Sequence, residues 1–124
     1  MSCAVLEVGN CSADHAALRQ LLQRLSDVQL IRAHDAQQAV KILQAQPIRL
    51  ILVNRVFDAD GSDGIEFIRA LQQDQSARSI PVMLISNYDW AQTAAVTAGA
   101  RHGFGKATLS SPETLKMLAE VLDQ

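Results

Sequence analysis

The chain has 124 residues, 48% of them hydrophobic and 19% charged, so it can bury the core expected of a single domain spanning residues 1–124. Its net charge of −2 argues against a nucleic-acid tail or a membrane-surface patch, and no apolar run approaches the roughly 20 residues that cross a bilayer. Two cysteines, Cys3 and Cys11, are too few for a disulfide framework, and the sequence shows no secretory signal, so we expect reduced thiols in a cytoplasmic protein.

Apolar runs alternate with stretches of helical periodicity along the chain. The first strand is predicted at residues 3–8, and a helix with leucines at helical spacing follows an N-cap at Ser12. A second short strand at 28–33 leads to a helix that Asp35 caps and Pro47 stops.

The same alternation continues in the middle of the chain. Residues 48–53 are almost all apolar, as in a strand that is buried on both faces. A turn-rich loop over 58–64 precedes a third helix, whose N-cap is expected at Ser62 or Asp63. Another continuous apolar strand is predicted at 80–85.

The last predicted elements are a short helix that ends at Gly99, a weak strand at about 101–105, and a helix that starts at Ser111-Pro112. Strict alternation of strands and helices predicts a parallel sheet with right-handed crossovers and helices on both faces. Ligand sites in such sheets lie beyond the carboxyl ends of the strands. The functional residues are therefore expected in the loops after Val8, Val53, Ile85 and Phe104.

The second half of the chain carries a characteristic order of residues. An apolar strand ends in Ser86, Gly99 stands between two alanines after the next helix, and Lys106 follows the fifth strand. This order resembles that of response-regulator receiver domains, and Ser86 and Lys106 match the family residue for residue. The resemblance covers the whole chain. It implies an α/β flavodoxin-like three-layer sandwich, with a five-stranded parallel sheet in the order 2-1-3-4-5 and about five helices, and a role in phosphorelay signal transduction in a two-component system.

Several positions depart from the family pattern, and three of them lose a carboxylate. Asn54 stands where the family has its phosphoacceptor aspartate, and Gly9 and Asn10 stand where it has a metal-binding acidic pair. Magnesium is usually bound with the help of carboxylates, and an amide is a poor nucleophile toward phosphorus. We therefore expect a pseudo-receiver with no enzymatic activity, no cofactor, lost or weak Mg²⁺ binding, and a degenerate phosphoacceptor site that consists of Asn54, Gly9, Asn10, Ser86 and Lys106.

Two alternatives remain open at this stage. A phosphorylation-competent receiver would use an atypical acceptor, Asp58 or Asp60, in the loop before the third helix. The same loop starts like an EF-hand, which makes Asp58, Asp60 and Asp63 weak metal candidates, although a plain turn with a helix cap is favoured. The other alternative is a small ligand or anion bound in the degenerate site itself, because fold alone does not fix function.

The sequence raises the question of a partner for two charged residues, Lys106 and Glu7. Lys106 lacks the usual acidic partners, so we expect it to pair with Asp58, Asp60, Asp63 or a backbone carbonyl, or to point into solvent. Glu7 lies inside an otherwise apolar strand, where an unpaired charge is costly. We expect Glu7 to pair with a basic side chain or to face an uncovered part of the sheet.

Three aromatic residues are candidates for a partner face: Tyr88, Trp90 and Phe104. Tyr88 and Trp90 are the only Tyr and Trp and flank the start of the short fourth helix, and exposed aromatic rings are good interface anchors. The alternative is that they pack on the core. Phe104 stands one place after Gly103, which occupies the family's aromatic switch position. The resemblance implies that a protein partner, such as a histidine kinase or a regulator, or a second copy in a homodimer, docks on the fourth helix, fifth strand and fifth helix, with no direct contact to nucleic acid or membrane.

Overall fold

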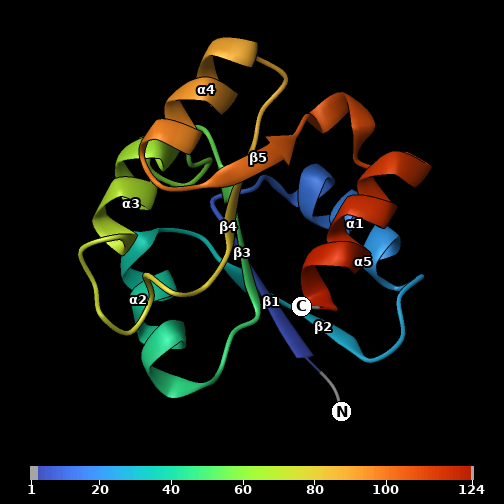
Figure 1. The fold of residues 1–124 in the computed structure, drawn as a ribbon, viewed down its shortest axis with the longest axis horizontal. Coiled ribbons are helices and arrows are strands. Elements are labelled where there is room, and N and C mark those ends of the chain that lie inside the picture. Colours follow the sequence, from blue (N-terminus) through green and yellow to red (C-terminus); the bar gives the residue numbers. More distant parts are fainter. Residues whose placement is uncertain (1–2, 124) are drawn as a thin grey trace.

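A computed structural model describes residues 3–123, and their five strands form one parallel sheet in the order β2-β1-β3-β4-β5 (Figure 1). This confirms the predicted flavodoxin-like arrangement. The strands are β1 (Cys3–Val8), β2 (Val28–Ala33), β3 (Leu50–Asn54), β4 (Val82–Ile85) and β5 (Arg101–Phe104). The helices are α1 (Ser12–Leu22), α2 (Ala36–Ala45), α3 (Gly64–Leu71), α4 (Asp89–Thr97), the short 3₁₀ helix η1 (Lys106–Thr108) and α5 (Pro112–Leu122).

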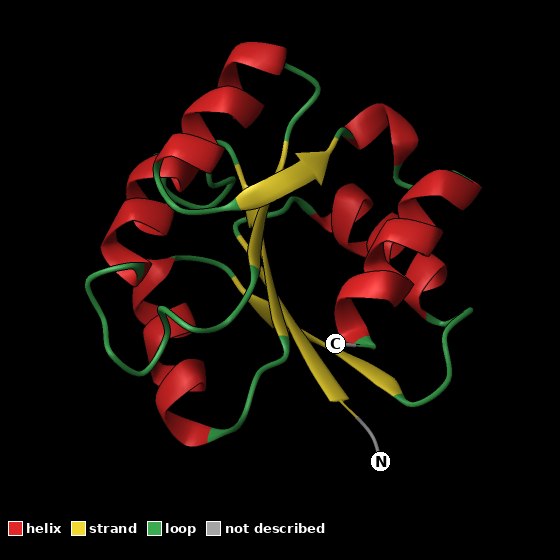
Figure 2. Ribbon diagram, in the orientation of Figure 1, coloured by secondary structure: helices red, strands yellow, loops and turns green. Residues whose placement is uncertain are grey.

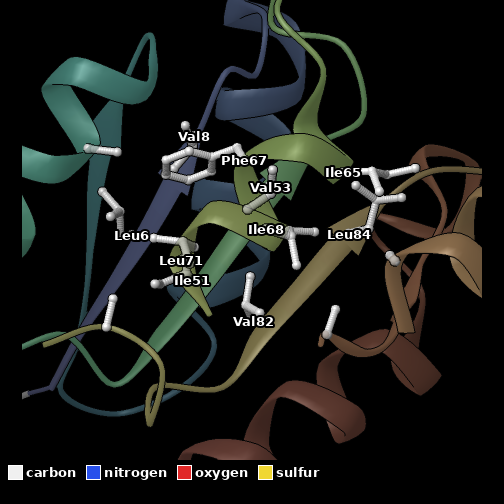
Figure 3. Packing of buried hydrophobic residues seen from close by; sticks show 14 of the residues in the cluster. Leu6, Val8, Ile51, Val53, Ile65, Phe67, Ile68, Leu71, Val82 and Leu84 are labelled. Carbon is white, nitrogen blue, oxygen red and sulfur yellow. The ribbon is translucent and has the colours of Figure 1, made fainter. Parts of the chain in front are cut away.

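The helices cover both faces of the sheet. Helices α2, α3 and α4 lie on one face, and α1 and α5 lie on the other (Figures 1 and 2). Each face has its own apolar cluster, and Figure 3 shows side chains of β1, β3 and β4 packed against Ile65, Ile68 and Leu71 of α3. Every residue of β3 is buried, as expected for a central strand covered on both faces. None of the helices within residues 3–123 has an apolar stretch long enough to span a membrane.

Helix caps show how local sequence fixes the element boundaries. The side chains of Asp35, Asp63 and Ser111 each accept a hydrogen bond from a backbone N–H in the first turn of α2, α3 and α5, as predicted. The prediction for α1 is wrong by one residue. Its N-cap is Cys11, which makes no side-chain cap, and Ser12 is the first helical residue. The Ser12 hydroxyl instead accepts a bond from a guanidinium on β2.

A register shift between β4 and β5 determines which face of the sheet the side chain of Phe104 lies on. Met83 pairs with Arg101 and Ile85 pairs with Phe104, so β5 has one more residue than β4 between these pairs. Such a bulge re-aims the following side chain. Phe104 therefore packs with Met83 and Ile85 in the buried cluster beneath α1 and α5. The prediction of Phe104 as a partner-face residue is wrong, because its ring is buried.

The buried side chain of Gln92 connects α4 to the edge of the sheet. Its Nε2 donates to the backbone carbonyls of Leu84 and Ser86 at 3.0 and 3.1 Å, and to that of Phe104 at 3.4 Å. Its Oε1 accepts from the backbone N–H of Gly103 at 2.9 Å. One amide thus satisfies main-chain groups of both β4 and β5 at the irregular part of their ladder. Gly103 is required beside it, because a Cβ there would lie 2.1 Å from the carbonyl oxygen of Leu84.

We predict that Gln92→Leu lowers the free energy of unfolding by about 1–3 kcal/mol, because it leaves buried carbonyls and one N–H without a partner. Chemical denaturation measures the change. Gln20→Leu is the matched control: Gln20 is an exposed helical residue on α1, so its replacement should change stability by less than about 0.5 kcal/mol. Equal losses in the two variants would contradict the role assigned to Gln92.

Candidate functional site

The carboxyl ends of β3, β4 and β5 surround a pocket of about 260 Å³. We name it the Asn54 pocket. Three of the five predicted site residues line it, together with residues of the loops after β3 and β4: Asn54, Ser86, Lys106, Arg55, Asn87 and Tyr88. Gly9 and Asn10, the other two predicted residues, do not line this pocket. The five predicted residues therefore do not form one pocket. The loop after β1 reaches the site through the backbone carbonyl of Gly9, which accepts a hydrogen bond from Asn54.

The buried amide of Asn54 holds two loops together. Its Nδ2 donates to the backbone carbonyl of Gly9 at 3.0 Å and to that of Val56 at 2.7 Å. The carbonyl of Gly9 also accepts from the backbone N–H of Asp58 at 2.9 Å. Two acceptors thus face the end of the Asn54 side chain. A carboxylate in this place would have no proton to offer either of them.

Gly9 leaves no room for an acidic side chain. Its φ of +82° lies in the left-handed region, which most L residues avoid. A Cβ at this position would lie 2.3 Å from a ring carbon of Phe57. Phe57 is itself buried and packs edge-on against Phe67, with 5.8 Å between the ring centroids. The ring of Phe57 fills the space next to Gly9.

Asn10 turns its side chain toward Glu7. Its Nδ2 donates to Glu7 Oε1 at 3.1 Å, and its Oδ1 is buried without a hydrogen-bond partner among residues 3–123. The backbone carbonyl of Asn10 accepts from the guanidinium of Arg32 at 3.1 Å. The Asn10 amide is therefore a hydrogen-bond donor to the buried Glu7 of β1, and it does not line the Asn54 pocket.

Glu7 is fully buried and has a basic partner, which confirms one of the two expectations for it. Its second carboxylate oxygen, Oε2, is hydrogen-bonded to Nδ1 of His15, on the first turns of α1. Together with the bond from Asn10, both carboxylate oxygens are occupied. Removing one hydrogen-bond partner of such a buried group leaves a polar atom without compensation, which is destabilising.

Lys106 forms an ion pair that the sequence analysis did not foresee. Its Nζ lies 2.9 Å from Oδ2 of Asp14, in the first turn of α1. The expectation of Asp58, Asp60, Asp63 or a backbone carbonyl is wrong for this lysine. Lys106 begins η1 after β5, and α1 starts at the same edge of the sheet, so the carboxylate of Asp14 is within reach. The pair is partly exposed and is worth about 0–1 kcal/mol.

Ser86 lies at the floor of the Asn54 pocket and is almost fully buried. Its Oγ accepts a bond from the backbone N–H of Tyr88 at 3.2 Å, and no acceptor for the hydroxyl proton is found in the described part of the chain. Beside it, Oδ1 of Asn87 accepts from the backbone N–H of Ala107 at 3.0 Å. The Asn87 bond connects the loop after β4 to η1, which follows β5.

Three residues form a stacked group at the rim of the Asn54 pocket. The rings of Tyr88 and Trp90 are stacked with 6.0 Å between centroids, and Cζ of Arg55 lies 5.2 and 5.5 Å from these centroids. Tyr88 is 53% exposed and Trp90 is 60% exposed. The rings therefore pack on each other and on Arg55, and not in the core. The sequence analysis missed Arg55, although its place directly after Asn54 put it at the site.

The acidic loop before α3 is built as a turn. Asp63 caps α3, and Oδ1 of Asp60 accepts from the backbone N–H of Ser62 at 2.9 Å. The hydrogen bonds from the Ser62 side chain and backbone hold the pKa of Asp60 below its ordinary value of 3.8. No group of three or more His, Cys, Asp and Glu residues suited to a metal ion occurs among the described residues.

The donor set at the site does not fit Mg²⁺. The Asn54 amide directs its N–H groups at two carbonyls, and Phe57 fills the space that an acid at Gly9 would need. The unpartnered oxygen of Asn10 is neutral and lies beside Glu7, whose two oxygens already have partners. Neutral carbonyl oxygens alone are poor compensation for dehydrating this ion.

Solved structures of similar fold are response regulators and receiver domains. A putative response regulator from Chloroflexus aurantiacus J-10-fl aligns with a TM-score of 0.86 at 16% identity, and a response regulator from Thermotoga maritima with 0.81 at 20% identity, each over 100% of both chains. The signal receiver domain of a signal transduction histidine kinase from Syntrophus aciditrophicus aligns with 0.73 at 20% identity, over 98% of this chain and 88% of that chain. Neither a family model nor a curated protein matches the sequence. The chain thus has the receiver fold.

We predict that Asn54→Asp lowers the free energy of unfolding by about 1–3 kcal/mol at neutral pH, because a buried carboxylate then faces two carbonyl oxygens. Asn87→Asp is the matched control. At Asn87 the side chain accepts a hydrogen bond through Oδ1, and a carboxylate would keep that bond. The free energy of unfolding should therefore change by less than about 0.5 kcal/mol. Thermal or chemical denaturation of both variants decides the matter. An Asn54→Asp variant as stable as the parent would contradict the assigned role of the amide.

Proposed function

We propose that the chain, as one domain over residues 1–124, is a pseudo-receiver. It would act in a two-component or related phosphorelay pathway, through protein–protein contact and without being phosphorylated. The receiver fold supports the pathway, and the Asn54 amide supports the loss of phosphorylation. The observation that carries the proposal is the pair of bonds from Nδ2 of Asn54 to the carbonyls of Gly9 and Val56.

A phosphoacceptor needs three things in one place: a carboxylate to attack phosphorus, a metal ion to offset charge, and room for both. Here an amide occupies the acceptor position, the donor set does not fit Mg²⁺, and the ring of Phe57 fills the adjacent space. The surviving Lys106 already has a carboxylate partner in Asp14. These features favour a domain that has no cofactor, catalyses nothing and does not cycle between charge states.

A protein partner is the remaining route to a signalling role. The candidates are a histidine kinase, a regulator or a second copy of the chain docked on α4, β5 and α5, in a cytoplasmic setting. The exposed rings of Tyr88 and Trp90 support a contact at the start of α4. The Gln92 bonds to β4 and β5 support a surface whose shape is held without an input signal.

We predict that the protein gains no phosphoryl group when it is incubated with a small phosphodonor and Mg²⁺, and that Asn54→Asp alone does not restore labelling. The reason is that Gly9 and Asn10 still offer the metal no carboxylate, so the new carboxylate at position 54 would be alone. Intact-mass spectrometry measures the result, with an aspartate-bearing receiver from the same preparation conditions as the positive control.

Three outcomes would contradict the proposal. An acid-labile phosphoryl group on Asp58 or Asp60 of the unmodified protein would identify an atypical acceptor, and Mg²⁺-dependent labelling of the Asn54→Asp variant would show that the metal is still held. A small molecule that copurifies in the Asn54 pocket would point to a ligand-binding protein instead.

A further inference from the structure

We infer that the Asn54 pocket and its rim bind an acidic segment of a partner protein, with a Glu or Asp carboxylate on Arg55 and a neighbouring apolar side chain on the Tyr88–Trp90 stack. The inference rests on the proposed function and specifies its partner. It places the contact at the loops after β3 and β4 and at the first turn of α4, and not along the rest of the surface formed by α4, β5 and α5.

The guanidinium of Arg55 is oriented by two aromatic rings and is free to bind an anion. Its guanidinium lies over the rings of both Tyr88 and Trp90, at 5.2 and 5.5 Å from their centroids. Such stacking fixes the plane of the group and leaves its N–H edge open. No carboxylate forms an ion pair with Arg55 within residues 3–123. A planar, oriented and unpaired guanidinium suits a carboxylate, which it can bind through two parallel hydrogen bonds.

The pocket beside Arg55 has the complementary charge for an acid. Two cationic side chains line it, Arg55 and Lys106, and no Asp or Glu does so among the described residues. Ser86 adds a hydroxyl whose proton is unused there. Asp14 takes part of the charge of Lys106, so Arg55 is the main anchor and Lys106 the minor one.

The rim of the Asn54 pocket is apolar and exposed. Val56, Tyr88 and Trp90 are 42%, 53% and 60% exposed, and they are three of the four exposed large hydrophobic residues in the described part of the chain. The fourth is Val96, farther along α4. Tyr, Trp and Arg are the residue types that dominate protein–protein hot spots. Their concentration at one corner indicates a contact that uses both charge and apolar area.

Size and shape favour a protein segment over a small ligand. The pocket volume of about 260 Å³ is below the range of roughly 300–1,000 Å³ that is typical of small-molecule sites. A free anion in the pocket would leave the rings of the rim uncovered. A peptide segment uses both parts, because an acidic side chain enters the pocket while its neighbour covers the rings.

Affinity selection of a random library of short peptides tests the inference, with the Arg55→Glu/Trp90→Ala double variant used for counter-selection. We expect the selected peptides to have an Asp or Glu close to an aromatic or aliphatic residue. Isothermal titration with such a peptide should show a loss of affinity of at least about tenfold in Arg55→Glu and in Trp90→Ala. Arg101→Glu and Val96→Ala are the matched controls, because both residues are exposed and lie outside the pocket.

The possible results separate this inference from the proposed function. The inference is overturned if no peptide survives counter-selection, if the selected peptides are basic or neutral, or if Arg55→Glu binds them as tightly as the parent. If only Arg101→Glu and Val96→Ala weaken binding, the contact lies on α4 and β5, so the inference fails while a protein-binding function stands. Inorganic phosphate is the last probe. Saturable binding of phosphate alone, abolished by Arg55→Glu and independent of Trp90, would make the pocket a small-anion site and overturn the inference.

Discussion

The side-chain amide of Asn54 determines what the carboxyl edge of this sheet can do. It donates to a carbonyl of the β1 loop and to one of the β3 loop, so the two loops that would carry a metal and a phosphoryl group are bonded to each other. The end of this side chain therefore acts as a hydrogen-bond donor, whereas a carboxylate in the same place could only accept. Gly9 and Phe57 complete this arrangement by filling the space beside the amide with a ring. On the proposed function, a single change at Asn54 would not recreate an acidic site, because two backbone carbonyls face the amide and the Phe57 ring lies beside Gly9.

The charges that remain near this edge are directed toward α1. Glu7 is hydrogen-bonded to His15, and Lys106 forms an ion pair with Asp14, so two residues on the first turns of α1 are the partners of Glu7 and Lys106. Arg55 is different, because its guanidinium lies over two aromatic rings and has no carboxylate partner within residues 3–123. The electrostatic consequence is a pocket with a cationic wall and no internal counter-charge among the described residues.

Much of this could be predicted from the sequence, for local reasons. Strand order followed from the family resemblance, and the caps at Asp35, Asp63 and Ser111 were readable because each is a short-range signal. Asn54, Ser86 and Lys106 converge because parallel strands bring their carboxyl ends together. The burial of Phe104 depends on a bulge, and the partner of Lys106 depends on where α1 begins, so neither was accessible to local patterns. Gln92 did leave a signal: it is a polar residue three positions before buried Ala95 and therefore lies on the inner face of α4.

A signalling switch needs two states that an input can favour differently. On the proposed function, the input that the receiver resemblance implies, a phosphoryl charge at the carboxyl edge, is missing. Here the edge is neutralised by the Asn54 amide, and Gln92 bonds the backbone of both strands to α4. On the proposed function, the stack of Arg55, Tyr88 and Trp90 is then presented in one arrangement at all times. The fraction of such a protein that is bound then depends on the concentrations of the protein and of its partner. Binding follows mass action when neither the conformation nor the charge of the protein changes.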